Sequence, residues 1–470
     1  MIKFYSTLSK KLEELKPVKN DFVRIYNCGP TVYDYDHLGH MWTYTMADLI
    51  RRVLEYNKLK VKQVMNITDV GHLTEGDVDK MLLASEREKK TPEQICEFYT
   101  KIFMENRRKL NILEPHIICK ATEHIKEMQA LIKKLLDNGY AYKISDGVYY
   151  NVPKFKDYGK LSGNTVERLE AGARIEVNPE KKHPADFALW IIAKPEHLMQ
   201  WDSPWGRGYP GWHIECSAMS TKYLGDELDI HTGGEDNIFP HHENEIAQSE
   251  GATGKKFVRI WMHTRFLNIE GEKMSKSLGN FLKLQDIEKK GFEPLALRYL
   301  FLITHYRTPL NFTWEGLKAA DTAWKRVLEF VDVLKNLKIK GEHNSEIDEL
   351  IEKSREAFKE AVNNDLNTPK AVSVLFDFMN KVNKFIAEKK LDQKNVLESY
   401  NLVKDFDGVL AILKEEEEVK TPKDVKKLLE DREKARKEKD WKKADELREK
   451  IKKKGFMILD GDSGPRLKNI

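Results

Sequence analysis

Apolar residues near the start of the chain form a short run, then a helical repeat, then a second run. Residues 22–26 predict a strand, which ends in a turn at 27–30. The helical repeat that follows has apolar positions spaced i, i+3, i+4, i+7 and i+8. These positions are Met46, Leu49, Ile50, Val53 and Leu54. Residues 61–67 predict a second strand, so the order indicates a βαβ unit, a parallel sheet and a ligand at its strand ends.

The pattern changes at about residue 120. An amphipathic helix is predicted over 125–136, ending at Asn138-Gly139. A hairpin follows, with its strands at 141–144 and 148–151. The strand pattern of the first region resumes near 229–231. We interpret the intervening segment as an insertion into the parallel domain.

Beyond residue 314 the apolar residues recur mostly at helical spacing, and an acidic run at 415–418 marks a linker. The last fifty residues, 421–470, carry a charge of +6, whereas the rest of the chain carries −2. Apolar spacing predicts two short helices there and then a strand at 456–459. Trp441 is a candidate platform for a nucleic-acid base, although packing within the module is the interpretation that we favour.

Composition narrows the class of protein. Of the 470 residues, 40% are hydrophobic and 33% are charged, which suffices for the cores of several domains. The net charge is only +4, so a nucleic-acid surface has to be local. Apolar runs of about 18 residues do not occur, and the N-terminal residues lack the apolar core of a signal peptide. Four cysteines are too few for a disulfide scaffold, so we expect a cytoplasmic protein without membrane contact.

Two short basic strings are the first candidates for chemistry. His37-Leu38-Gly39-His40 precedes the predicted helix, and Lys273-Met274-Ser275-Lys276-Ser277 lies past the middle of the chain. A helix N-terminus favours anions, and lysines can stabilise charge on a leaving phosphate. Taken alone, each string would be interpreted as an ordinary polar surface. Together they resemble the two signature sequences of class I aminoacyl-tRNA synthetases.

Four residues are acceptable zinc ligands: Cys28, Cys216, His241 and Glu245. A helix would place His241 and Glu245 on one face, at i and i+4. Spacing alone also allows buried cysteines and a surface His-Glu pair. We assign the other two cysteines, at 96 and 119, to packing.

Five motifs together resemble cysteinyl-tRNA synthetase, and the resemblance runs nearly the full length of the chain. The motifs are Cys28-Gly29-Pro30-Thr31-Val32-Tyr33-Asp34, His37-Leu38-Gly39-His40, Gly211-Trp212-His213-Ile214-Glu215-Cys216, Phe239-Pro240-His241-His242-Glu243-Asn244-Glu245 and Lys273-Met274-Ser275-Lys276-Ser277-Leu278-Gly279-Asn280. One stretch departs from the family pattern, because residues 70–78 intervene before Asp79-Lys80.

The resemblance implies a role for each candidate residue. It implies one zinc ion on Cys28, Cys216, His241 and Glu245, and this ion would bind the substrate thiolate. Cysteine binding is implied for Cys28, Gly29, Thr68, Trp212 and His231. ATP binding, with magnesium, is implied for His37, His40, Gly234, Asp236, Lys273 and Lys276. His37, His40, Lys273 and Lys276 would be catalytic, with Lys276 the stronger candidate of the two lysines.

A zinc ion suits a site that has to bind cysteine and reject serine. A hydrophobic pocket rejects a hydroxyl analogue only about 100-fold, whereas zinc binds a thiolate far better than an alcohol. Four protein ligands normally close a zinc site, and a substrate-binding zinc needs an open position. A fifth ligand or a loosely held Glu245 would provide that position, and the sequence leaves both open.

The resemblance also implies a fold and its division. We expect an α/β protein with a Rossmann-type parallel-sheet catalytic domain, an inserted connective domain, a helical bundle and a small α+β anticodon-binding module. The expected ranges are 1–118 and 201–253 for the two halves of the catalytic domain, 119–200 for the insertion, 254–316 for a stem-contact region with the lysine loop, 317–418 for the bundle and 419–470 for the anticodon-binding module.

The implied activity is ATP-dependent formation of cysteinyl-adenylate and transfer of cysteine to the 3′ end of cysteine tRNA. We expect a monomer whose partners are cysteine, ATP and cysteine tRNA. One alternative is a cysteine ligase that passes the same adenylate to an amino sugar; such relatives lack the C-terminal tRNA module. Another is a non-catalytic tRNA- or zinc-binding paralogue, which would not need both phosphate-binding motifs.

Overall fold

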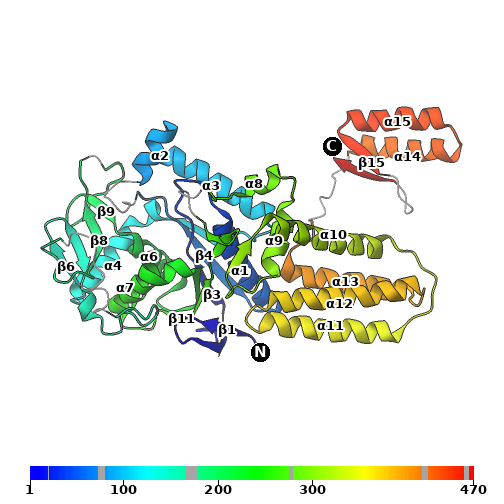
Figure 1. Ribbon diagram of the computed structural model, residues 1–470. Helices are drawn as coiled ribbons and strands as arrows, with labels where there is room; N and C mark the ends of the chain where they lie inside the picture. The colour runs from blue at the N-terminus through cyan, green and yellow to red at the C-terminus, as the bar shows by residue number, and fades with distance from the viewer. Residues whose placement is uncertain are drawn as a thin grey trace.

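The computed structural model describes residues 1–19, 21–71, 80–165, 178–195, 197–274, 279–414, 422–459 and 465–469. Its centre is a five-stranded sheet in the order β11-β10-β3-β4-β5, in which every neighbouring pair is parallel. The strands are β3 (Val23–Asn27), β4 (Val61–Ile67), β5 (Ile117–Lys120), β10 (Leu228–Gly234) and β11 (Val258–Thr264). The predicted parallel α/β fold is therefore confirmed (Figure 1).

Both faces of this sheet are covered. Ile25 belongs to one hydrophobic cluster and its neighbour Tyr26 to the other, because successive strand residues point to opposite faces. Helix α1 (Leu38–Tyr56) packs on the first face, where its apolar stripe is buried. On the other face lie α6 (Trp212–Leu224) and α7 (Glu243–Thr253). All five residues of β3 are buried, as expected for a strand in a sheet that is covered on both faces.

The strand order places a ligand site between β3 and β10. From β3 the chain proceeds to β4 and β5 on one side, whereas β10 and β11 lie on the other. The loops that leave β3 and β10 therefore diverge and open a crevice at the carboxyl ends of the strands. Cys28 follows β3, and Gly233 and Gly234 end β10.

An antiparallel sheet, in the order β6-β7-β8-β9, lies between β5 and β10 in the sequence. Its strands are β6 (Ala141–Ile144), β7 (Gly147–Tyr150), β8 (Phe187–Ile192) and β9 (Gly208–Pro210). Helix α4 (Ile125–Asp137) precedes it, and the chain turns at Gly139 with a φ of 78°. The helix and the hairpin agree with the elements predicted from sequence. Figure 1 shows this sheet and the helical bundle at opposite ends of the parallel sheet.

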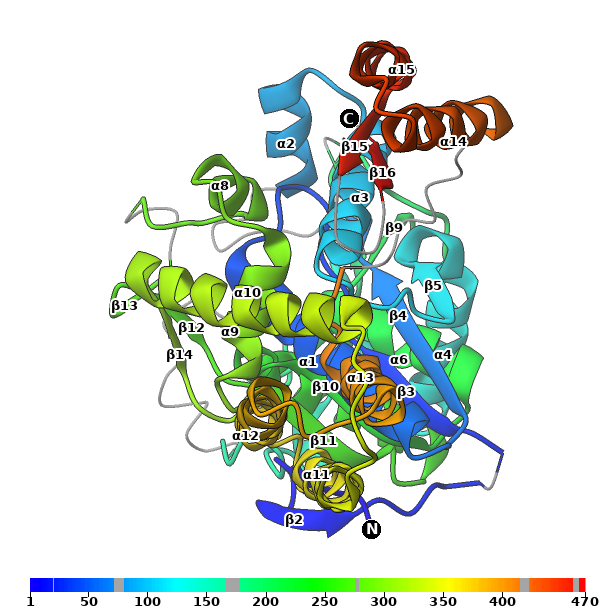
Figure 2. The same cartoon turned by 90° about the vertical axis from the view of Figure 1, so that its right-hand side faces the viewer.

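The remaining elements frame the core. N-terminal to α4 they are β1 (Lys3–Ser6), β2 (Lys11–Glu14), α2 (Lys80–Glu88) and α3 (Pro92–Lys109). After β11 come β12 (Leu267–Ile269), β13 (Glu272–Lys273), α8 (Leu284–Lys289), α9 (Pro294–Leu302) and β14 (Leu310–Phe312). The bundle comprises α10 (Trp314–Asn336), α11 (Ser345–Asn363), α12 (Thr368–Ala387) and α13 (Gln393–Leu410), which Figure 2 shows nearly end-on for α11 to α13. No helix within the described ranges is long and apolar enough to cross a membrane.

The C-terminal module has a small core of its own, formed by Val425, Ile451, Phe456 and Ile458. Its elements are α14 (Lys423–Lys437), α15 (Trp441–Lys453), β15 (Phe456–Leu459) and β16 (Arg466–Asn469). The two predicted helices and the strand are confirmed. The favoured interpretation of Trp441 is wrong, since this first residue of α15 is 59% exposed instead of packed.

Candidate active site

Four side chains from four segments converge beside the crevice. Cys28 follows β3, Cys216 lies in α6, His241 lies in the π-helical segment Ile238–His242, and Glu245 lies in the first turn of α7. The Sγ atoms of Cys28 and Cys216 are 3.9 Å apart. His241 Nε2 is 3.2 Å from Glu245 Oε1, which in turn lies 3.8 Å from Cys28 Sγ. The four residues implied as zinc ligands therefore form one buried cluster.

The spacing of these donors suits a tetrahedral zinc ion. Two thiolates at about 2.3 Å from zinc lie about 3.8 Å apart, and a nitrogen and an oxygen at about 2.1 Å lie about 3.4 Å apart. Burial, together with Cys216 and Glu245, raises the pKa of Cys28 well above its ordinary value. Burial also raises the pKa of Glu245. A bound cation would favour the anionic, ligating forms of both groups.

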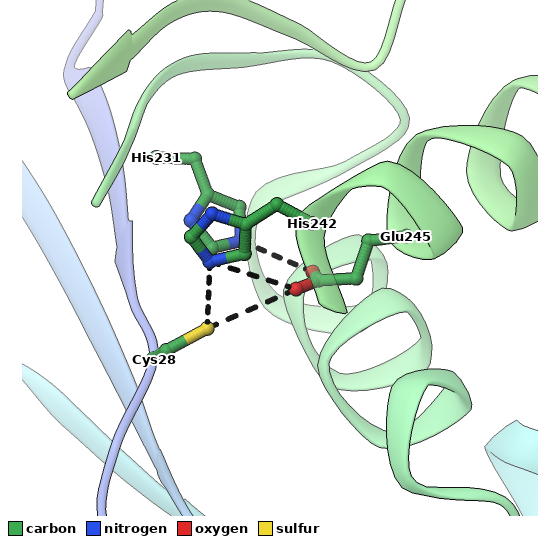
Figure 3. A group of neighbouring side chains, drawn as sticks. All are labelled: Cys28, His231, His242 and Glu245. Atoms are coloured by element: carbon green, nitrogen blue, oxygen red, sulfur yellow. Dashed lines mark hydrogen bonds and ion pairs between the residues drawn. The ribbon is translucent and has the colours of Figure 1, made fainter. Parts of the chain in front are cut away.

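A second set of four donors shares Cys28 and Glu245 with the first and adds His231 and His242 (Figure 3). His242 Nε2 is 3.2 Å from Cys28 Sγ and 3.9 Å from Glu245 Oε1. His231 Nε2 is 3.0 Å from Glu245 Oε2. Geometry alone thus offers two overlapping ligand sets.

Access to a cavity distinguishes the two sets. Cys28, Cys216 and His241 line a cavity of about 180 Å³, and His231 and His242 are not among the described residues that line it. Gly29, Thr68 and Trp212 line the same cavity. A metal in the first set would therefore face a bound molecule, as a substrate-binding zinc requires.

Gly29 allows the strand ends to approach closely. A Cβ atom at this position would lie 1.6 Å from the carbonyl oxygen of Asn66, which excludes any side chain. The backbone N–H of Gly29 donates to Asn66 Oδ1 at 2.8 Å, and Asn66 Nδ2 donates to Thr68 Oγ1 at 3.0 Å. Thr68 in turn donates to Glu215 Oε2 at 3.0 Å. This network fixes the floor of the cavity.

Trp212 and His231, both predicted to bind cysteine, lie at different depths. Trp212 stands at the start of α6, is 42% exposed, and packs its ring 4.6 Å from that of His241. His231 is fully buried behind Glu245, with its ring stacked 4.6 Å from Trp261. His231 therefore supports Glu245, and it does not face the cavity.

Two histidines that sequence reasoning missed support Cys28. His242 Nδ1 is 2.7 Å from His263 Nε2, and His263 Nδ1 is 2.8 Å from Thr7 Oγ1. Burial lowers the pKa of His242 well below its ordinary value and that of His263 to about 3, so both rings are neutral. When Cys28 is a thiolate, the hydroxyl of Thr7 donates to His263, His263 donates to His242, and His242 donates to the sulfur. Such outer hydrogen bonds orient and tune metal ligands.

A second cavity, of about 240 Å³, contains the residues predicted to bind ATP. His37, His40, Gly234, Asp236 and Lys273 all line it. His37 is the N-cap of α1, where its Nδ1 accepts from the backbone N–H of His40 at 3.3 Å, and the two rings stack 3.8 Å apart. Burial lowers the pKa of His40, although Asp236 opposes this shift. Neutral histidines at a helix N-terminus can donate hydrogen bonds to phosphate oxygens.

Lys276 and the stretch 72–79 lie outside the described residues, so the roles expected of them stay predictions. Lys273 ends β13, and its Nζ lies 5.2 Å from the centre of the Phe266 ring. Cys96 and Cys119 are buried and free, as predicted for packing residues.

Comparisons with known proteins identify the family. The family description "tRNA synthetases class I (C) catalytic domain" matches residues 14–322, and "Cysteinyl-tRNA ligase anticodon binding domain" matches 419–464, with a DALR domain at 357–414 between them. A cysteine–tRNA ligase of Treponema denticola is 43% identical over 90% of this chain and 88% of its own. That of Pyrococcus abyssi is 45% identical over 87% of this chain and 86% of its own. The chain belongs to the cysteine–tRNA ligase family.

Solved structures similar to this chain show the same fold at low sequence identity. Mycobacterium tuberculosis methionyl-tRNA synthetase, in complex with methionyl-adenylate, aligns with a TM-score of 0.59 over 83% of this chain and 89% of its own, at 13% identity. A LeuRS–tRNA–LeuAMS ternary complex of Agrobacterium radiobacter K84 aligns with a TM-score of 0.61 over 85% of each chain, at 10% identity. The class I synthetase fold thus extends well beyond close relatives of this family.

Proposed function

We propose that this protein activates cysteine with ATP and transfers it to the 3′ end of cysteine tRNA. One observation carries the proposal: the cavity bordered by Cys28, Cys216 and His241 shares His40, Gly234 and Asp236 with the cavity predicted to bind ATP. A substrate cysteine whose thiolate binds a metal on the first set of donors would therefore have its carboxylate close to the nucleotide phosphates. Family membership supports both the reaction and the acceptor.

We assign zinc to Cys28, Cys216, His241 and Glu245, because three of these four border the cavity. When bound, the ion would hold the substrate thiolate and thereby discriminate against serine, whose hydroxyl is a poor ligand for zinc. Trp212 would cover the site from the side of His241. Thr68 and the backbone of Gly29 would form the floor beneath the substrate.

In the first step, a carboxylate oxygen of cysteine attacks the α-phosphorus of magnesium-bound ATP. The bond to the bridging oxygen of the β-phosphate breaks, and pyrophosphate leaves with the electron pair. His37 and His40 donate to the phosphate oxygens at the start of α1, where the helix dipole also favours negative charge. Lys273 and Lys276 stabilise the departing pyrophosphate. Asp236 accepts from a ribose hydroxyl, close to Gly234.

In the second step, a hydroxyl oxygen of the terminal ribose of tRNA attacks the carbonyl carbon of cysteinyl-adenylate. The ester bond forms, the bond to the phosphate oxygen breaks, and AMP leaves, while the hydroxyl proton passes to the leaving phosphate group.

A tRNA substrate also agrees with the domain division expected from sequence, which we propose as follows. Residues 1–118 and 201–253 would form the catalytic domain, 119–200 the insertion, 254–316 the stem-contact region, 317–418 the bundle and 419–470 the anticodon-binding module.

Cysteine-dependent ATP–pyrophosphate exchange, followed by charging of purified cysteine tRNA, tests this function. We expect exchange with cysteine alone and charging only when tRNA is added. Exchange with release of an amino-sugar conjugate but no charging would favour the amino-sugar ligase instead. Absence of both activities in zinc-loaded protein would reject an enzymatic role.

A further inference from the structure

A cavity of about 520 Å³ is larger than the cysteine and ATP cavities and shares none of their described lining residues. It lies where the end of α1, the loop after α3 and the end of α13 meet. Four of the described side chains that line it are cations: Arg52, Arg108, Lys404 and Lys414. We refer to it as the basic cavity.

Arg52 brings a positive charge that is only partly balanced. Its Nε lies 2.8 Å from Asp48 Oδ2, but the same oxygen lies 2.6 Å from Arg298 Nη2, so two guanidinium groups share one carboxylate. The two Nη atoms of Arg52 donate to the carbonyls of Gly408 at 3.1 Å and Asn111 at 2.7 Å. These contacts use three of the five N–H donors and fix a side chain that is only 13% exposed, so the group is positioned before a ligand binds.

Two further cations reach the basic cavity from different elements. Arg108 lies near the end of α3, and Lys404 lies in α13. Neither side chain has an ion-pair or hydrogen-bond partner among the residues that the structure describes. Lys414, by contrast, is paired with Glu293 at 3.0 Å. Arg108 and Lys404 can therefore bind an anion without giving up a contact within the protein.

Two carboxyl groups also line the basic cavity, on Asp407 and Glu114. Asp407 Oδ1 accepts from the backbone N–H groups of Ile412 at 2.7 Å and Leu413 at 2.9 Å, and burial raises the pKa of this carboxyl group. With both acids ionised, the four cations still leave a formal charge of +2. None of the described lining residues is aromatic, so the cavity is suited to negative charge and not to a stacked base.

We propose that the basic cavity binds a small anion with two or more linked phosphate groups, of the class of pyrophosphate and tripolyphosphate. An arginine binds phosphate oxygens through two donors at once, and a lysine adds a point charge. Linked phosphates can contact cations on different elements, and the cavity is larger than one phosphate needs. The ligand would join α1 and the end of α3 to α13, apart from the site of the proposed reaction.

Calorimetric titration of the zinc-loaded full chain with tripolyphosphate, without magnesium, tests this site. Arg108→Gln combined with Lys404→Gln should weaken binding at the basic cavity by about 10-fold or more, because each cation supplies a charge-assisted hydrogen bond. Lys359→Gln combined with Lys381→Gln is the matched control, since these exposed lysines of α11 and α12 do not line the cavity. The ATP cavity is the same in all three proteins, so tripolyphosphate bound there contributes equally to each titration.

Cysteine-dependent pyrophosphate exchange should be equal in the three proteins, which would show that both variants fold. Equal affinities for tripolyphosphate in all three, or an equal loss of affinity in the control, would overturn the site. A lower affinity for tRNA in the Arg108 and Lys404 variant alone would also overturn it, because the cavity would then contact the phosphates of tRNA. Absence of exchange in wild type would instead reject the proposed function, since the titration does not depend on turnover.

Discussion

At the scale of single residues, the proposed first step assigns different tasks to His40 and to the two lysines, Lys273 and Lys276. His40 borders both the cysteine cavity and the ATP cavity, and burial lowers its pKa, so it can donate to phosphate as a neutral ring. In the proposed reaction, the two lysines would supply the positive charge instead. Charge that is needed mainly as pyrophosphate departs acts on the transition state and much less on substrate binding.

Lys276→Ala should therefore lower kcat for cysteine-dependent exchange by about 100-fold or more, a size typical of losing one electrostatic contact to the transition state. The KM for cysteine should change by less than about threefold. Lys289→Ala is a suitable control, because this lysine of α8 has a side chain that is 78% exposed. Exchange kinetics with a raised cysteine KM and an unchanged kcat would show that the role assigned to Lys276 is wrong.

The sequence predicts the four candidate ligands better than it predicts the residues that support them. Cys28, Cys216, His241 and Glu245 follow from motif resemblance, and the structure brings all four together. His263 carries no sequence signal, because β11 meets the segment Ile238–His242 only in the folded chain. His242 has a weak signal, as the neighbour of His241. The position of His231 behind Glu245 likewise depends on packing against Trp261.

At the scale of elements, a buried ion pair joins α1 to α9 and to the end of the bundle. Arg298 Nη2 lies 2.6 Å from Asp48 Oδ2, and both side chains are fully buried. Arg298 also donates to the carbonyls of Leu110 at 2.8 Å and Leu410 at 2.7 Å. The guanidinium thus ties together α1, the end of α3, α9 and α13.

Removing the charge of Asp48 should destabilise the fold strongly. Burial raises the pKa of Asp48, but the charges of Arg298 and Arg52 lower it more, so its pKa lies below the ordinary value. At neutral pH, Asp48→Asn should cost about 3–5 kcal/mol, because the guanidinium of Arg298 is left buried without its partner. A lowered pKa gives stability that is complete above the unfolded value of about 3.9 and is lost as pH falls through the folded value.

Urea unfolding of wild type and Asp48→Asn, measured near pH 7 and again near pH 3.5, tests this ion pair. The difference in the free energy of unfolding should shrink at the lower pH. Asp377→Asn, on the exposed face of α12, should change that free energy by no more than about 0.5 kcal/mol at either pH. Equal differences at both pH values would contradict a charged Asp48.

The elements themselves follow largely from apolar periodicity. The strand predicted over 61–67 coincides with β4, and that over 22–26 is shifted by one residue from β3. The π-helical segment Ile238–His242 is not predictable in this way, since its backbone conformation depends on packing and not on a repeat. Neither is the order of strands, because pairing between segments far apart in sequence leaves no periodic signal.

At the scale of the whole molecule, the C-terminal module stands apart from the catalytic chemistry. Its core is separate from the two larger clusters, and basic residues end both of its helices. The exposed ring of Trp441 adds an aromatic surface that the sequence interpretation did not favour. A basic module with an exposed aromatic residue suits contact with single-stranded loops of RNA.

Deleting residues 421–470 should leave cysteine-dependent exchange unchanged and weaken tRNA charging, mostly by raising the KM for tRNA. The affinity of the intact protein for tRNA should also fall more steeply with added salt than that of the shortened protein. The reason is that the shortened protein makes fewer contacts with the phosphates of tRNA. Equal charging by both proteins would reject a tRNA role for the module.

The selection of cysteine over serine by a zinc ion is the central claim, and one comparison tests it most directly. Zinc content and the ratio of cysteine- to serine-dependent exchange should be measured for wild type, Cys216→Ser and Cys119→Ser. Cys119 is the matched control, because it is equally buried and its Sγ donates to the carbonyl of Met65, away from the cavity. We expect one zinc ion and strong selection of cysteine in wild type and Cys119→Ser, and loss of both in Cys216→Ser. Unchanged zinc content and selectivity in Cys216→Ser would contradict the account.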